Sequence, residues 1–435
     1  MEKRRLRGPM GAAIWLVVWA LIGYLLLVLA YCLPVERMQK HLESCVDAFA
    51  KGATSLVKDD TGMWVDYLTD SLILAEAVYN GEESPLEQAA AVYSNAVDAE
   101  GDQPWSYRKI QAALQEGASS GEGEYPRYWH GNLVYLKPLL LIFDYKDILT
   151  LNMLGQLLLM LWIAQLLVRR GLPHLLLPMT LAFGMLTPVA MALCLQYMPC
   201  FYVMAVACIV VLQCPGFVQR HKGMFFLTVG MATCYFDFLT FPLITLGIPL
   251  VLSLLLNGES WRKGVRSVVW SSACWGVGYV VFWAEKWALG SLVLGQNLFA
   301  DAWNSLRLRS SRETLGQSIS YLDVLRNNFK GYDLRTWELL FAILLGALVL
   351  LALVRFLTKR DAVPQDLNML VPLLLVACMP FAWYLVTVNH SYIHYGYTHK
   401  EWMITAWALA SAAAELFRRW WLPFKKVGNR TGVSE

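Results

Sequence analysis

Charged residues are scarce in this chain. They make up 16% of its 435 residues, whereas a soluble protein carries about 25%. So few charges do not cover the surface of a soluble protein of this size, and the 57% of hydrophobic residues excludes a disordered chain. Several apolar runs of about 20 residues are each long enough to cross a bilayer. The sequence therefore predicts an all-α, polytopic membrane protein.

The motifs of soluble nucleotide and zinc enzymes are also missing. The chain has no Gly-rich phosphate loop, no CxxC pair and no HExxH sequence. An internal repeat, which would favour an inverted-repeat transporter, is not evident. The net charge of +3 gives no reason to expect nucleic acid as a partner, because the charges are segregated along the chain.

About ten transmembrane helices are predicted from the apolar runs. They cover residues 10–33, 148–168, 173–193, 197–215, a pair within 224–256, 267–285, 336–356, 367–388 and 401–417. The run 224–256 is too long for one helix and contains Asp237 and Pro242, so we divide it there. Basic residues then fall in each short loop on the side that holds both termini, which places both termini in the cytoplasm of a cell-membrane protein.

These spans divide the chain into six segments. They are a cytoplasmic tail with the first transmembrane helix (1–33), an external loop domain with an interfacial helix (34–147), a transmembrane bundle (148–285), a second external loop (286–335), a further bundle (336–417) and a cytoplasmic tail (418–435). Residues 34–132 hold 17 of the 33 acidic residues and only 7 basic ones. The external first loop, which we expect to be helical, is therefore strongly acidic.

Two aspartates in the first loop are candidate catalytic residues. Asp66 and Asp70 are four positions apart and share one face of a helix predicted over residues 62–79. Two carboxylates this close repel each other, and partial burial makes one of them more basic, which suits a general base. The alternative is a solvated helix face, with Asp59, Asp60 and Thr61 as helix caps.

Cations on the acidic side are candidate phosphate ligands. Arg127 and His130 precede a predicted interfacial helix, at the depth of a lipid phosphate. Lys286 ends a span between two tryptophans, and Arg307 and Arg309 belong to a loop cluster whose guanidinium groups match phosphate. For the segment of Arg127 and His130, the alternative is anchoring by a belt of aromatic side chains. Lys286 would otherwise be a lysine that extends its ammonium group to the membrane interface, and the two arginines would lie on a solvated loop helix.

Three further polar residues lie beside or within spans. Asp237 interrupts an apolar run, where a carboxylate is costly and usually functional, although a shallow turn would leave it hydrated. His390 and His394 are four positions apart, as in some metal sites, but the nearby acid is Glu401 alone. We therefore expect these histidines to contact a sugar or phosphate and expect no cofactor, with a divalent metal as the weaker alternative.

All these residues fall on the external side of the predicted topology. That layout, with aspartates at Asp66 and Asp70 in the first loop, resembles the GT-C superfamily of polytopic membrane glycosyltransferases. The strings VDYLTD, YWHGNLVYLKPLL, YFDFLTFP and HSYIH also resemble an uncharacterised multi-pass membrane protein family of Firmicutes. The second resemblance implies no function.

The first resemblance implies inverting transfer of a sugar from a polyprenyl-phosphate donor to an extracytoplasmic glycan or protein acceptor. Asp66 or Asp70 would accept the proton of the acceptor hydroxyl. The cations would stabilise the leaving lipid phosphate, and Asp237 and His390 would orient the sugar. Two alternatives stay open: a transporter or flippase of a lipid-linked cargo, and a non-catalytic protein of cell-envelope assembly.

Overall fold

The computed structural model describes residues 8–51, 54–55, 64–97, 101–115, 123–314, 316–330, part of 343–358, and 363–421. These residues are almost entirely helical, which confirms the predicted all-α class. Two small antiparallel ladders are also present. One pairs β1 (Thr54–Ser55) with β2 (Trp64–Val65), and the other pairs β3 (Glu313–Thr314) with β4 (Gln317–Ser318).

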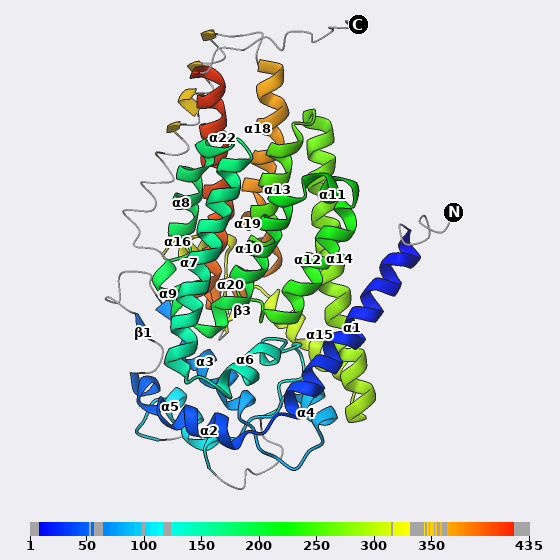
Figure 1. Ribbon diagram of the computed structural model, residues 1–435, viewed down its shortest axis with the longest axis vertical. Coiled ribbons are helices and arrows are strands. Elements are labelled where there is room, and N and C mark those ends of the chain that lie inside the picture. Colours follow the sequence, from blue (N-terminus) through cyan, green and yellow to red (C-terminus); the bar gives the residue numbers. More distant parts are fainter. Residues whose placement is uncertain are drawn as a thin grey trace, which may run out of the picture.

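Long apolar helices run side by side along the longest axis of the molecule (Figure 1). Leu21, Leu25 and Leu29 on the first of them are each more than half exposed, which is the pattern of a lipid-facing surface. Five segments in the described ranges are long and apolar enough to cross a membrane: α1 (Pro9–Tyr31), α7 (Tyr145–Arg169), η4 with α10 (Leu195–Tyr197 and Met198–Gln213), α14 (Trp261–Leu294), and α18 with α19 (Val363–Ala377 and Met379–Val386). The protein is therefore a helical membrane protein by length and composition of its helices.

Several predicted spans have different boundaries in the structure. The break expected at Asp237 is present, because α12 (Lys222–Phe236) ends just before it and α13 (Ile244–Asn257) begins seven residues later. The segment 173–193 is divided into η3 (Pro173–Leu175), α8 (Leu176–Gly184) and α9 (Pro188–Ala192). Thr187 has a φ of 51° there, and Pro188 lacks the N–H that a continuous helix needs.

The end of α14 differs from the prediction. This helix has 34 residues and continues to Leu294, so the segment predicted as a second loop from residue 286 begins with helix. Most of the predicted span 336–356 lies outside the described residues, as do Asp59, Asp60 and Thr61.

Short helices from residues 34–147 gather at one end of the bundle, and α11 (Pro215–Arg220) lies toward the other end (Figure 1). We call the described residues of 34–147 the cap. Its helices are α2 (Glu36–Glu43), η2 (Val46–Lys51), α3 (Tyr67–Ala77), α4 (Pro85–Ala91), α5 (Trp105–Ala113) and α6 (Leu133–Leu140). Ser84 and Glu87 form a capping box that fixes the start of α4.

A second set of short elements follows α14. It contains α15 (Leu298–Arg309), the β3–β4 hairpin, α16 (Tyr321–Lys330), α20 (Val388–Ile393), α21 (Tyr395–Thr398) and η6 (His399–Glu401), before α22 (Trp402–Trp421). Both α15 and α16 contact α20, so the segment between the predicted spans 367–388 and 401–417 is largely helical and packed.

Candidate functional site

The candidate site centres on a contact between two residues that are far apart in the sequence. Arg309, the last residue of α15, places its guanidinium 2.6 Å from Nε2 of His394, which follows α20. Arginine carries no acceptor, so Nε2 of His394 accepts and the imidazole is neutral with its proton on Nδ1. Burial and then the charge of Arg309 lower the pKa of His394 to about 4.

His390 lies beside this pair, with its ring centre 4.8 Å from that of His394. The side chain is buried, and its Nε2 lies 2.7 Å from the carbonyl oxygen of Leu239. Because a carbonyl only accepts, Nε2 carries the proton, and Nδ1 presents a lone pair that has no partner among the described residues. Burial, then His394 and Arg309, keep the pKa of His390 well below its usual value. The centre thus holds one fixed positive charge and two neutral imidazoles.

Tyrosines surround this centre. Tyr397 stacks on His394 with ring centres 5.2 Å apart. The Arg127 guanidinium lies 5.3 Å from the centre of the Tyr125 ring. Burial raises the pKa of Tyr125, and the positive charges of Arg127 and Arg309 partly oppose this increase. The tyrosines of the YIHYGYT run were visible in the sequence, but their place in the site was not predicted. Together these groups suit a ligand that has an anion and a polar ring.

Asp66 approaches the same centre from the cap. It is the N-cap of α3 and accepts hydrogen bonds from the backbone N–H of Thr69 at 2.9 Å and from the Thr69 hydroxyl at 2.8 Å. The side chain stays half-buried. Burial raises the pKa of Tyr397, and the negative charge of Asp66 adds to the increase. Trp64, two residues before Asp66, packs on Gly396. Asp66 is therefore both a helix cap and a neighbour of the site.

Asp70 lies on the next turn of α3 but is completely buried. It accepts hydrogen bonds from the Tyr145 hydroxyl at 2.8 Å and from the backbone N–H groups of Leu195 and Gln196 at 2.9 and 3.0 Å. Burial raises the pKa of Asp70 to about 7, although these hydrogen bonds oppose the increase. These contacts join α3 to the start of η4, so Asp70 links the cap to the helix bundle.

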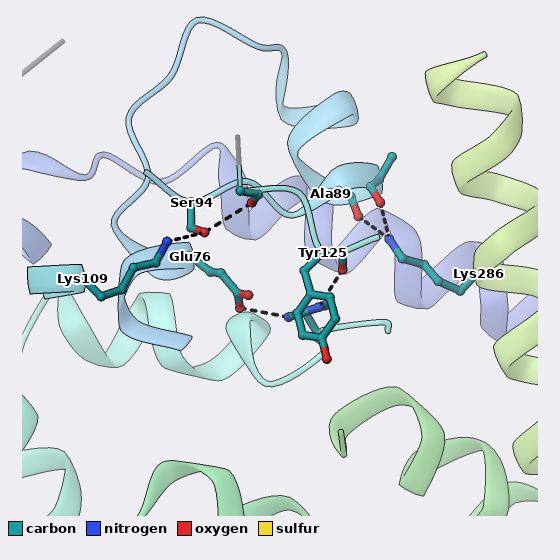
Figure 2. A network of polar contacts seen from close by, with 9 residues as sticks. Glu76, Ala89, Ser94, Lys109, Tyr125 and Lys286 are labelled. Atoms are coloured by element: carbon teal, nitrogen blue, oxygen red, sulfur yellow. Dashed lines mark hydrogen bonds and ion pairs between the residues drawn. The ribbon is translucent and has the colours of Figure 1, made fainter. Parts of the chain in front are cut away.

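Lys286 is also completely buried. Its ammonium group donates to the carbonyl oxygens of Ala89 and Ala90 at 2.8 and 2.7 Å, at the C-terminal end of α4 (Figure 2). Lys137 donates in the same way to Ala77 at the end of α3, over 2.6 Å. Positive charge at a helix C-terminus is favourable because the last carbonyls lack intrahelical partners. Lys286 therefore faces the cap and not the centre around Arg309.

His130 forms a buried pair with Glu76. Its Nδ1 lies 2.9 Å from a Glu76 oxygen and its Nε2 lies 3.0 Å from the carbonyl of Tyr125 (Figure 2). Both ring nitrogens face acceptors, so a protonated imidazole satisfies both. The His130 ring also contacts Phe238 at 4.8 Å between centres. The pair holds the segment that carries Tyr125 against the turn after α12.

Arg127 and Asp237 support the site from two sides. Arg127 hydrogen-bonds to Ser305 and lies 3.4 Å from Asp301, and both partners belong to α15. Asp237 is buried and accepts from the backbone N–H of Thr240 at 3.0 Å and from the Thr240 hydroxyl. The first set of contacts holds α15, and the second holds the turn that contains Leu239. Arg307 is exposed on α15.

An apolar cavity of about 670 Å³ lies between α7, α10 and α12, next to α6. At the end next to α6, the cavity is lined by Tyr135, Met198 and Phe236. Along its length, the lining includes Leu151, Val206, Val210 and Ala232. Met198 and Phe236 adjoin Tyr197 and Asp237 in the sequence, so the cavity reaches the level of the cap. Its lining suits a hydrocarbon chain.

Within the described part of the chain, no group of three or more His, Cys, Asp or Glu side chains is arranged to hold a metal ion. The structure therefore brings together Arg309, His390 and His394, and Trp64 places the cap segment that carries Asp66 beside them. Arg127 contacts the same helix that carries Arg309. The structure places Asp70, His130, Asp237 and Lys286 in buried contacts elsewhere in the cap and the adjoining turns. Comparison with protein-family models, curated proteins and solved structures finds no match to this chain.

Proposed function

We propose that this protein is a membrane glycosyltransferase that transfers a sugar from a polyprenyl-phosphate donor to an extracytoplasmic acceptor with inversion. The observation that carries the proposal is the cluster of Arg309 with two neutral histidines, beside which Trp64 places the cap segment that carries Asp66. A carboxylate and a fixed cation near one polar centre would match the two charges that such a transfer develops.

The Arg309 guanidinium would bind the donor phosphate. It is already oriented by its hydrogen bond to His394, so little side-chain freedom is lost when the anion binds. The unpaired Nδ1 of His390 would accept a hydrogen bond from a sugar hydroxyl. The aromatic ring of Tyr397 lies beside both histidines, His390 and His394.

The donor tail would lie in the apolar cavity between α7, α10 and α12. Its volume of about 670 Å³ accommodates only part of a polyprenyl chain, so the rest would remain in the membrane. Holding the tail in this way would fix the phosphate relative to the acceptor, which lowers the entropic cost of the reaction.

In the reaction, the acceptor oxygen forms a bond to the anomeric carbon while the bond from that carbon to the phosphate oxygen breaks. Asp66 accepts the proton of the acceptor hydroxyl. The leaving polyprenyl phosphate keeps the electron pair, and Arg309 stabilises its negative charge. We favour Asp66 over Asp70 as the base, because Asp70 is buried and already accepts four hydrogen bonds.

The test is transfer of a labelled sugar from a polyprenyl-phosphate donor by the purified protein. Asp66→Asn retains a good helix cap and should lose about 100-fold or more of the turnover, since general-base catalysis contributes that much. Arg309→Ala should lose a similar factor. Arg307→Ala, on the exposed side of the same helix, is the matched control and should keep its activity.

Normal turnover in Asp66→Asn would contradict the base assignment, and normal turnover in both variants would overturn the proposed site. Movement of an intact lipid-linked sugar across liposomes, without release of lipid phosphate, would instead support the flippase alternative.

A further inference from the structure

A second cavity, of about 870 Å³, lies toward the end of the bundle opposite the cap. Three segments form it: the first turn of α1, the junction of α11 with α12, and the first turns of α14. Trp15 of α1 donates a hydrogen bond from its indole to the hydroxyl of Thr228 on α12, over 3.0 Å. This contact joins α1 to α12 on the cap side of the cavity.

The mouth of this cavity is strongly basic. Among the described residues, its lining includes Arg220, Lys222, Lys263 and Arg266, against the single acid Glu259. Lys222 is half-buried, and its ammonium group donates to the hydroxyl of Ser267 over 2.7 Å, which holds the charge at the wall. Its two remaining hydrogens are available for an anion. The four cations come from the end of α11, the start of α12 and the first turns of α14, so they approach the mouth from separate segments.

The deeper wall of the cavity is apolar. It includes Ala12 and Leu227, and it follows α14 through Trp270 and Cys274 to Val277. From Arg266 to Val277 the helix rises by roughly 16 Å. Trp270 and Val277 are about half exposed, as expected for side chains that face hydrocarbon. A free phosphate needs no such wall, whereas a phospholipid places its acyl chains along one.

We propose that this cavity binds an anionic phospholipid, with its headgroup phosphate among Arg220, Lys222, Lys263 and Arg266 and an acyl chain along α1 and α14. The site is separate from the centre around Arg309 and does not depend on the proposed function. A bound lipid would fill the space between α1 and the two helices behind it. Because the Tyr24 hydroxyl on α1 donates to the Leu86 carbonyl of the cap over 2.6 Å, the lipid would also steady the attachment of the cap.

The test is native mass spectrometry of the purified full-length protein in non-ionic detergent, with phosphatidylglycerol and phosphatidylcholine at equal concentration. We expect phosphatidylglycerol to be retained with a preference of at least about fivefold, since a single basic residue near an anionic lipid already contributes roughly that factor. Lys263→Gln combined with Arg266→Gln should abolish most of this preference. The control Arg262→Gln removes an equally exposed charge, which packs on Trp261 and does not line the cavity, and should preserve the preference.

A second variant distinguishes loss of the lipid site from a folding defect in the double variant. Ala12→Phe fills the apolar wall and leaves every cation in place, so it should reduce retention of phosphatidylglycerol without changing the charge. Each variant is compared with the parent for its elution volume and melting midpoint in phosphatidylcholine. Equal retention of the two lipids by the parent protein, or an equal loss in Arg262→Gln, would overturn the proposal. Displacement of the lipid by inorganic phosphate at similar concentration would also overturn it, because the site would then recognise a free anion.

Discussion

Arg309 donates a hydrogen bond to Nε2 of His394 over 2.6 Å, across 85 positions of sequence. The contact fixes the tautomer of His394 and keeps this imidazole neutral beside a permanent cation. It also joins the end of α15 to the end of α20, so the geometry of the candidate site depends on both helices.

This contact predicts a change in the pH dependence of stability. The pKa of His394 is lowered to about 4 from 6.5, so between these values the unfolded chain binds a proton that the folded protein does not. The contribution of His394 to stability therefore declines as the pH falls from 6.5 toward 4. Arg309→Gln removes one cause of the lowered pKa and should make this decline smaller.

The measurement is the melting midpoint of Arg309→Gln and of its parent at about pH 5 and about pH 7. Asp70, whose pKa is raised to about 7, contributes the opposite trend, so each variant is compared with the parent at the same pH. Arg307→Gln should follow the parent. An identical pH dependence in Arg309→Gln and the parent would show that Arg309 does not act on His394.

Replacement of Asp70 should reduce stability. In Asp70→Ala the backbone N–H groups of Leu195 and Gln196 lose their buried acceptor, and each unpaired buried donor costs about 1–3 kcal/mol. Tyr145→Phe removes one donor and leaves both backbone contacts, so its effect should be smaller. Thermal unfolding of the two variants measures the difference. If Asp70→Ala has the same melting midpoint as the parent protein, Asp70 does not stabilise the contact between the cap and the bundle.

Lys286→Met should also destabilise the protein without weakening donor binding. The substitution keeps a long side chain but leaves the carbonyls of Ala89 and Ala90 without their buried donor. The melting midpoint should fall, while the KM for the proposed polyprenyl-phosphate donor, measured well below that midpoint, should stay the same. Leu292→Ala, at an exposed position of the same helix, is the control. A large rise in KM at an unchanged melting midpoint would instead place Lys286 at the donor phosphate.

The Glu76–His130 pair should show strong coupling. Removal of one partner leaves an uncompensated buried charge, which costs about 3–5 kcal/mol. Glu76→Gln and His130→Gln should each be strongly destabilising, and the double variant should lose less than the sum of the two. A double-mutant cycle in thermal or denaturant unfolding measures the coupling. Additive effects would indicate that the two side chains act independently.

Much of the helical framework could be predicted from hydropathy. The break at Asp237 followed from the length of its apolar run, because no single helix needs 33 residues to cross a bilayer. The break at Thr187-Pro188 carried a sequence signal too, since the residue before a proline avoids the helical conformation. By contrast, residues 285–294 contain no proline and only one glycine, so hydropathy alone did not show that α14 continues to Leu294.

The candidate site was predictable only in its components. The paired histidines and the arginine cluster were visible, but the pairing of Arg309 with His394 depends on packing between distant segments. The same limit applies to Asp70, whose backbone partners lie 125 and 126 positions away. Lys286 between two tryptophans has the same sequence pattern whether it reaches a lipid phosphate or caps a buried helix. Only the position of α4 distinguishes these roles.

The length of α14 has a mechanical consequence. With 34 residues it measures roughly 50 Å. Its first turns carry Lys263 and Arg266, and near its other end the indoles of Trp283 and Trp287 donate to the backbone of Arg127. The helix is therefore a single rod whose two ends serve different parts of the molecule. If the helix tilted about its middle, its first turns, which line the basic cavity, and the tryptophans that bind Arg127 would move in opposite directions. A displacement of one end would therefore displace the other.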